Sequence, residues 1–206
     1  MSNEHPRVFG IGLSRTGTTS LCDALHILGY TPTHNPDPGP FFEGDFSLFE
    51  SEHDAGADIS VAAFYKELDE AFPGSRFILT LRDAESWLES VVVHFVNLPK
   101  NSAIGARGGV RERVYGAHWP SPEQFLSAYK RHISEVAHYF RGRTDLLVMD
   151  PTKGEGWDRL CPFLGRPVPG EPYPKSNPTT DHMRERARRN LESGKTHGDG
   201  VVLPVF

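Results

Sequence analysis

The chain has few cysteines, no long apolar run and no excess of positive charge. Its two cysteines, Cys22 and Cys161, cannot form the disulfide framework of a small secreted protein. No apolar stretch reaches the about 18 residues that a membrane-spanning helix needs, and no apolar segment of signal-peptide type follows the start of the chain. The net charge of −5 argues against a general nucleic-acid binder. We therefore expect a soluble cytoplasmic protein that has no nucleic-acid partner.

The stretch Val8–Ser20 is the most informative part of the sequence. A short apolar run, Val8–Ile11, predicts a buried strand, and leucines at helical spacing follow from Leu21. Between them lies a loop rich in glycine and hydroxyl side chains. A strand, a glycine-rich loop and a helix together turn backbone N–H groups and the positive end of the helix toward an anion. The sequence therefore predicts a phosphate-binding loop.

This loop departs from the pattern of nucleoside triphosphatases at one position. Gly12-x-x-x-x-Gly17-Thr18-Thr19 is a P-loop pattern, but Thr18 stands where the phosphate-binding Lys would be. The cation of the loop, Arg15, comes three residues earlier. That Lys neutralises the β- and γ-phosphates in phosphoryl transfer, so its loss argues against ordinary Mg-nucleotide chemistry.

Strands alternate with helices along the rest of the chain. Apolar and β-branched runs predict strands, the shortest only partly β-like, over 30–34, 54–59, 76–81 and 145–150. Helical periodicity and capping residues predict helices over 61–72, 83–98, 121–143, 156–165 and 181–192. This alternation predicts an α/β fold with a central parallel sheet in three α/β/α layers, similar to P-loop NTPases.

We expect one domain over 1–206, with its core at 5–178 and a C-terminal helix and tail at 179–206. The segment 99–120 is rich in glycine and poor in core residues, so it predicts a mobile loop or lid. The phenylalanines of 41–49 favour a short helix packed in the core over contact with a substrate. Both segments are candidates for shaping a substrate pocket.

The loop sequence also resembles that of a known family. The residues from 14 to 20 are similar to the 5′-phosphosulfate loop of sulfotransferases that use 3′-phosphoadenosine 5′-phosphosulfate (PAPS), in which a basic residue precedes Ser/Thr-Gly-Thr-Thr. The likeness to small bacterial P-loop sulfotransferases covers residues 7 to about 178. It implies PAPS as donor, 3′-phosphoadenosine 5′-phosphate (PAP) as product and no metal. The implied cofactor-binding residues of the loop are Ser14, Arg15, Thr16, Gly17, Thr18, Thr19 and Ser20.

A second feature of the same family follows the strand at 76–81. In the sulfotransferase fold an Arg at a strand end and a Ser eight residues later grip the 3′-phosphate, and Arg82 and Ser90 match that spacing. The Arg-Lys-Gly segment that cytosolic sulfotransferases carry near their C-terminus is missing. Lys153, Lys175 and the arginines of 184–189 remain open as substitutes, and a surface helix face is the favoured reading of those arginines.

The resemblance implies in-line sulfuryl transfer to a hydroxyl or amine of a small molecule. Arg15 is the predicted catalytic cation, which stabilises charge as the leaving group departs; Arg is always protonated and cannot act as a proton donor. A hydroxyl acceptor also needs a general base. The candidates are Asp58 at a strand end, His34 after the first crossover and, less favoured because of its apolar neighbours, His94.

Two other functions stay open at this point. The run 146–150 is shaped like a Walker B strand, whose Asp150 would hold Mg²⁺ in a P-loop kinase or NTPase; in a sulfotransferase that residue would be structural. A non-catalytic nucleotide-binding protein would also retain the loop. The acceptor and the oligomeric state do not follow from the sequence.

Overall fold

The computed structural model describes residues 5–193, which fall into two compact units interleaved in sequence. Unit 1 comprises the residues up to Arg82 together with Tyr139–Asn177. Unit 2 comprises Asp83–His138 and the residues from Pro178 onward. The assignment of the whole chain to one domain stays a prediction, and its expected tail at 194–206 lies outside the described residues.

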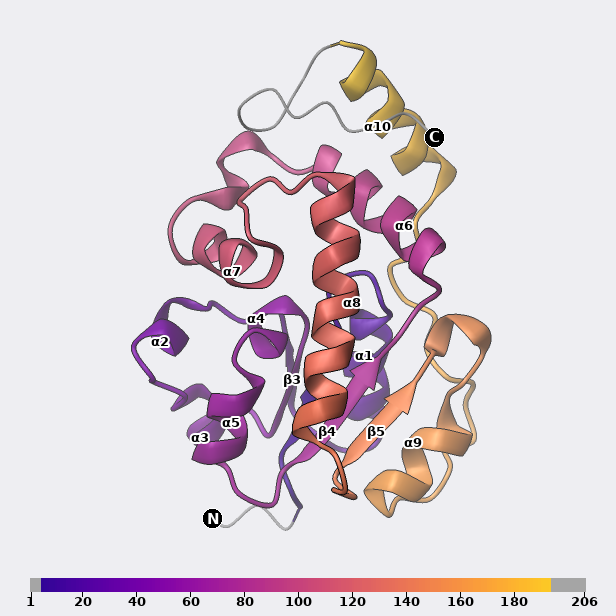
Figure 1. Ribbon diagram of the computed structural model, residues 1–206. Coiled ribbons are helices and arrows are strands. Elements are labelled where there is room, and N and C mark those ends of the chain that lie inside the picture. The colour runs from indigo at the N-terminus through magenta and orange to yellow at the C-terminus, as the bar shows by residue number, and fades with distance from the viewer. Residues whose placement is uncertain (1–4, 194–206) are drawn as a thin grey trace. The chain divides into compact units, whose positions relative to one another are not determined.

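Unit 1 is built on a five-stranded parallel sheet in the order β2-β3-β1-β4-β5. The strands are β1 (Val8–Gly10), β2 (Pro32–His34), β3 (Ala55–Ala57), β4 (Arg76–Thr80) and β5 (Leu146–Met149). Figure 1 shows β4 and β5 side by side and pointing the same way. The chain crosses over β1 on its way from β3 to β4, and ligands of α/β sheets bind at the carboxyl ends of strands beside such a switch point. The predicted parallel α/β fold is confirmed.

Helices pack on both faces of this sheet. On one face Val8, Ile78 and Leu147 join the apolar side chains of α1 and α9 in a buried cluster. On the other face the ring of Phe9 contacts the rings of Phe49 in α3 and of Phe72 directly after α5, which puts both helices on that side. The helices of unit 1 are α1 (Thr18–Ile27), α2 (Gly39–Phe42), α3 (Leu48–Ser51), α4 (Ile59–Ala62), α5 (Tyr65–Ala71), η2 (Pro151–Lys153) and α9 (Trp157–Leu164).

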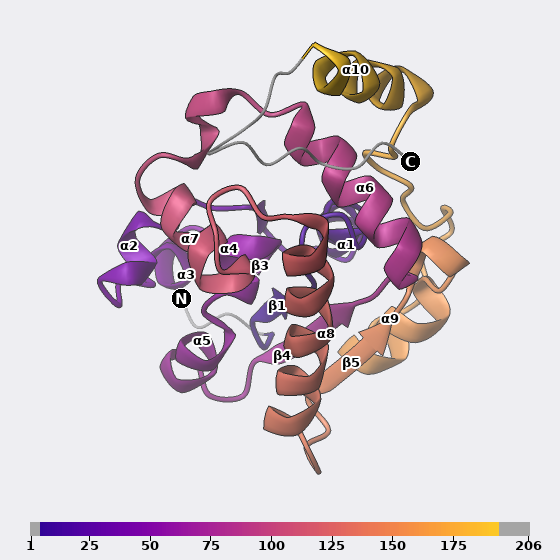
Figure 2. The ribbon, with the colours of Figure 1, turned by 45° about the horizontal axis from the view of Figure 1, so that its top comes forward.

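Unit 2 is helical. It contains α6 (Ala84–Val96), η1 (Lys100–Ala103), α7 (Ala106–Tyr115), α8 (Pro122–Tyr139, whose last residue belongs to unit 1) and α10 (Asp181–Glu192). The indole of Trp87 on α6 stacks on Tyr129 of α8 with ring centroids 4.3 Å apart. In Figure 2, α10 lies next to α6, and the amide of Asn97 donates to the carbonyl oxygen of Met183 at 2.9 Å. Asp83 caps the start of α6, because its carboxylate accepts from the N–H of Ser86 at 3.0 Å.

Two sequence-based expectations are wrong. The segment 99–120 is not a loop, because most of it forms η1 and α7. Its Gly108 allows close packing: a Cβ there would lie 2.2 Å from the carbonyl oxygen of Ala103. The helix expected over 61–72 is divided, since α4 ends at Ala62 and α5 begins at Tyr65. Within residues 5–193 no helix is long and apolar enough to cross a membrane.

Candidate functional site

The loop between β1 and α1 is fastened to the end of β4. Thr16 is fully buried, and its hydroxyl donates to the carbonyl oxygen of Leu13 at 2.7 Å and lies 2.7 Å from the hydroxyl oxygen of Thr80. Gly12 permits this approach, because a Cβ there would lie 1.9 Å from the Thr80 hydroxyl. The N–H of Thr16 also has a partner, the carbonyl of Leu13 at 3.2 Å. Thr16 therefore holds the loop in shape rather than offering a free donor.

The donors of the loop come instead from the start of α1. Gly17 adopts the left-handed conformation with φ 98°, which glycine reaches at low cost, and α1 begins at the next residue. The first bond of the helix runs from the N–H of Leu21 to the carbonyl of Gly17 at 3.0 Å. The N–H groups of Thr18, Thr19 and Ser20 precede that bond and have no acceptor within the helix. N–H groups in this position, together with the helix dipole, form an arrangement that favours a bound anion.

Arg15 places a guanidinium at this loop. Its backbone is left-handed, with φ 75°, and its Nη2 donates to the carbonyl oxygen of Asn177 at 3.2 Å. Partial burial lowers the pKa of Arg15, the positive charge of Arg82 lowers it further, and the carboxylate of Asp58 acts in the opposite direction. Two guanidinium groups therefore stand close enough to repel each other, which is the arrangement that a bound anion would relieve.

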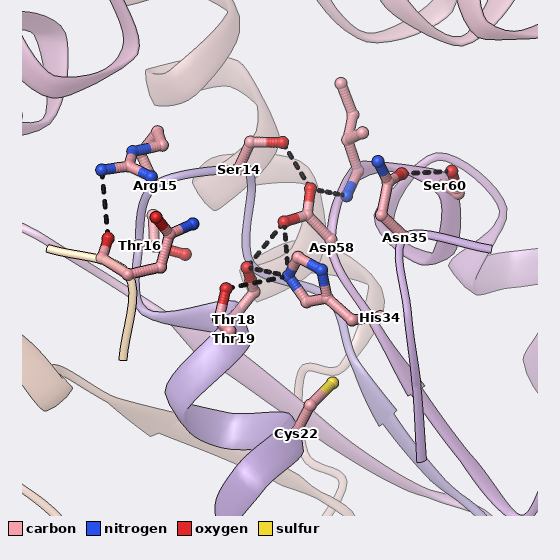
Figure 3. Close-up of polar contacts among 12 residues, drawn as sticks. Ser14, Arg15, Thr16, Thr18, Thr19, Cys22, His34, Asn35, Asp58 and Ser60 are labelled. Carbon is pink, nitrogen blue, oxygen red and sulfur yellow. Dashed lines mark hydrogen bonds and ion pairs between the residues drawn. The ribbon is translucent and has the colours of Figure 1, made fainter. Parts of the chain in front are cut away.

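Asp58 and His34, which the sequence left as alternatives, form one pair. His34 is the last residue of β2, and Asp58 directly follows the neighbouring β3, whose Ala57 pairs with His34. The Nε2 atom of His34 lies 3.0 Å from Oδ2 of Asp58, and it also lies 3.2 Å from the hydroxyl oxygens of Thr18 and Thr19 (Figure 3). The pair thus links two strand ends with the phosphate-binding loop.

The carboxylate of Asp58 has no lone pair left for a substrate. Its Oδ1 accepts from the hydroxyl of Ser14 and from the N–H of Ile59, the latter at 2.6 Å, and its Oδ2 accepts from Thr18 at 2.7 Å and from His34 (Figure 3). Burial by itself raises the pKa of Asp58, but the bonds from His34, Ser14 and Ile59 outweigh it and hold that pKa far below its usual value. Asp58 is therefore a fixed anion that orients its neighbours.

His34 has one nitrogen engaged and one available. Its Nδ1 makes no hydrogen bond within the described part of the chain, and its side chain is 35% exposed. Burial alone lowers the pKa of His34, but the hydrogen bond with Asp58 and the charge of that carboxylate raise it above its usual value. When neutral, with the Nε2 proton on the Asp58 side, the imidazole presents Nδ1 as a base.

Other residues of the site escaped the sequence analysis. Asn35 follows His34 in a left-handed conformation with φ 51°, and its amide oxygen accepts from the buried hydroxyl of Ser60 at 2.8 Å. This bond fixes the turn that carries His34. Asn tolerates left-handed backbone better than other non-glycine residues, and that was the only local signal. Thr80 gave none, because its contact with Thr16 joins distant parts of the chain. The contacts of the turn at Ser176–Asn177 with the loop and α1 likewise do not follow from the sequence.

The predicted partners Arg82 and Ser90 fall in different units. Arg82 directly follows β4 in unit 1, whereas Ser90 is buried on α6 in unit 2 with its hydroxyl oxygen 2.7 Å from that of Thr179. Their joint grip on a 3′-phosphate stays a prediction from spacing. His94 also lies on α6, with its ring beside that of Phe95.

Three of the remaining charged candidates, Asp150, Lys153 and Arg184, have partners in the protein. Asp150 caps η2, where its Oδ1 accepts from the N–H of Thr152 at 2.9 Å, as expected of a structural acid. Lys153 lies 3.8 Å from the other oxygen of Asp150. On α10, Arg184 pairs with Glu89 at 2.7 Å. Within residues 5–193 no three His, Cys, Asp or Glu side chains are grouped as a metal site would require.

The chain is similar to known proteins over most of its length. The sequence profile of the sulfotransferase domain family matches residues 7–39 and 34–182. Ava biosynthesis cluster protein M of Aspergillus versicolor is 27% identical over 214 aligned residues, which cover 82% of this chain and 79% of that protein. The crystal structure of a sulfotransferase from Alicyclobacillus acidocaldarius has the same fold, with a TM-score of 0.54 and 18% identity over 92% of this chain and 94% of that one.

The profile match spans most of the chain and includes the loop, both members of the His34–Asp58 pair and Arg82. The likeness to the solved structure supports the fold alone, and the profile carries the family assignment. The chain belongs to the sulfotransferase family.

Proposed function

We propose that this protein transfers the sulfuryl group of PAPS to a hydroxyl, or to an amine, of a small molecule. The observation that carries the proposal is the phosphate-binding loop, which combines N–H groups at the start of α1 with the guanidinium of Arg15 and lacks the Walker lysine. Membership of the sulfotransferase family supports this use of the loop. The protein would work in the cytoplasm on a small-molecule acceptor.

The residues of unit 1 fit the 5′-phosphosulfate end of PAPS. The N–H groups of Thr18–Ser20 and the hydroxyl of Thr19 would hold the 5′-phosphate, while the hydroxyl of Thr18 stays bonded to Asp58. Arg15 and Arg82, whose like charges repel each other, would both be stabilised by an anionic ligand, Arg15 by its 5′-phosphosulfate and Arg82 by a second phosphate. Arg82 would bind the 3′-phosphate, with Ser90 as the partner that its spacing predicts.

PAPS, when bound, supplies the sulfuryl group and a phosphate as leaving group. Sulfuryl transfer resembles phosphoryl transfer in that positioning and electrostatics contribute most of the catalysis. Arg15 would stabilise the negative charge that builds on the leaving side, because its guanidinium is delocalised and permanently charged. Ser14 and Thr18 would keep the loop closed on Asp58.

His34 is the proposed general base. Its Nδ1 would take the proton of the acceptor hydroxyl, and Asp58 would hold the ring through Nε2 and stabilise the imidazolium that forms. Asp58 itself is excluded from this step on our proposal, because both of its oxygens already have two donors each. In this proposal Asp58 orients the imidazole ring and His34 takes the proton.

Calorimetry with PAP, ATP and GTP, each with and without Mg²⁺, tests the donor. We expect PAP to bind without metal and more tightly than either triphosphate. Mg²⁺-dependent binding of ATP or GTP in preference to PAP would contradict the proposal and favour a P-loop kinase or NTPase. Binding of PAP without any turnover of PAPS would indicate a non-catalytic nucleotide-binding protein.

A further inference from the structure

The turn at Ser176–Asn177 holds the side chain of Arg15, although the two contacting residues are 162 positions apart in the chain. The N–H of Ser176 donates to the hydroxyl oxygen of Ser20 at 2.9 Å, and the hydroxyl of Ser176 donates to the carboxylate of Asp23. The carbonyl of Asn177 then accepts from Nη2 of Arg15 at 3.2 Å (Figure 3). The turn is thus bonded both to α1 and to the cation of the loop.

A fixed acceptor matters for this particular arginine. Its guanidinium is repelled by Arg82, and a long, flexible arginine side chain loses rotamer entropy when it is held in one place. The carbonyl of Asn177 can hold it only if the turn itself is fixed. Both bonds of Ser176 go to the first two turns of α1, the helix whose N-terminus forms the anion site. The acceptor for Arg15 therefore has a fixed place relative to the phosphate-binding donors.

We propose that Ser176 is a positioning residue that sets where the guanidinium of Arg15 stands, acting through the Asn177 carbonyl and its own bonds to Ser20 and Asp23. This inference rests on the proposed function for its consequence in sulfuryl transfer. The hydroxyl of Ser20 serves the same end, since it accepts from Ser176 while its backbone N–H remains at the anion site. The purely structural alternative is that the turn only fastens the end of unit 1 to α1.

Chemical labelling of Arg15 separates the two without any nucleotide. Phenylglyoxal modifies accessible guanidinium groups, and mass spectrometry of peptides gives the rate at each arginine. In Ser176→Ala and in Asp23→Ala, which remove the same hydrogen bond from either side, Arg15 is expected to react several-fold faster relative to Arg159. Ser51→Ala is the matched control, because it removes a serine hydroxyl bonded to the carbonyl of Ser47 on α3. Unchanged labelling of Arg15 in both variants overturns the proposal.

Binding of PAP supplies the second readout. Ser176→Ala is expected to weaken PAP binding about tenfold in the wild-type background, within the range of couplings seen between members of one hydrogen-bond network, and to have little further effect when Arg15→Ala is already present. If Ser176→Ala weakens PAP binding by the same factor with and without Arg15→Ala, Ser176 does not act through Arg15. If the wild-type protein failed to bind PAP, the proposed function would fail, while the labelling rates would still decide the role of Ser176.

Discussion

At the scale of single residues, Asp58 shows what the site requires of the backbone. With φ 89° and ψ −175° it occupies a region that is almost confined to glycine and costs about 1–3 kcal/mol for other residues. A glycine there would relieve the strain but would leave Ser14, Thr18, Ile59 and His34 without their common acceptor. The Asp58 side chain thus satisfies four donors at once. Because Asp58 is only 5% exposed, water could not readily replace it as their acceptor.

The pH dependence of turnover tests the division of roles between His34 and Asp58. The base must be neutral, and the pKa of His34 is raised, so turnover should rise with pH through a midpoint above 6.5. Asp58→Asn removes the carboxylate that raises this pKa, so the midpoint should move down while kcat falls. The rate of PAP release from PAPS across pH 5–9 measures both.

The control for this prediction is His53→Gln. His53 contacts the carbonyl of Thr31 through Nδ1 and has no bond to Asp58, so the profile should keep its midpoint. A midpoint that does not move in Asp58→Asn, or a profile that survives His34→Ala, would mean that another group takes the proton.

Arg82 can be tested by affinity alone. Arg82→Gln is expected to weaken PAP binding at least about tenfold, because a hydrogen bond to a charged group is worth about 1.5–3 kcal/mol. The matched control is Arg159→Gln, which makes the same change in net charge on α9 and removes contacts with Glu155 and with the carbonyl oxygen of Val148. Calorimetry on both variants at one salt concentration gives the comparison. Equal losses of affinity would mean that Arg82 contributes only its charge and does not contact the nucleotide.

At the scale of elements, the sequence predicted best where signals are local. An apolar run, a glycine pair and a leucine repeat within Val8–Leu28 were enough for the strand, loop and helix at the start of unit 1. The prediction of a mobile loop at 99–120 was wrong because it rested on the glycines of that segment. Gly108 instead lets α7 approach Ala103, and the buried Arg111 lies with its guanidinium carbon 4.9 Å from the ring centroid of Phe95. Neither contact can be read from neighbours in the sequence.

The candidate site could be predicted as a set of residues but not as an arrangement. Arg15 stands in the loop and Arg82 beyond β4, as their motifs indicated. That His34 and Asp58 form one pair depends on the register of β2 against β3. The contact between Arg15 and Asn177 depends on the return of the chain to α1. Strand register and contacts between distant segments are set by packing over long sequence separations. The spacing of residues along the chain therefore could not decide which residue is the general base.

The loop between β1 and α1 packs against the end of β4, and this contact should contribute to the free energy of unfolding. Gly12→Ala places a methyl group 1.9 Å from the hydroxyl and 2.6 Å from the carbonyl oxygen of Thr80, so we expect a loss of about 1–3 kcal/mol. In a chain of this length the melting temperature should fall by about 2–4 °C per kcal/mol.

Gly170→Ala is the control, since a Cβ there has nothing within 4 Å and its backbone is not left-handed. Its unfolding free energy should stay within about 0.5 kcal/mol of wild type, measured by the same thermal or denaturant titration. Equal stabilities of the Gly12→Ala and Gly170→Ala variants would show that the loop can move away from Thr80.

At the scale of the whole molecule, unit 1 carries the loop, both proposed catalytic groups and Arg82. The family match from residue 7 to 182 extends over both units, so it includes residues of the helical unit 2 as well as the sheet. The loop at the carboxyl end of β1 lies within the matched range, and its Arg15 is the residue on which the proposed activity depends most directly.

The most direct measurement is the release of PAP from PAPS, with water or a panel of alcohols, phenols and amines as acceptors and with EDTA present throughout. The account predicts release by the wild-type protein without divalent metal. It also predicts that Arg15→Ala loses at least about 100-fold in rate, the size of effect seen when one stabilising donor is removed from a transition state. Near-normal release by Arg15→Ala, or release that requires Mg²⁺, would contradict it.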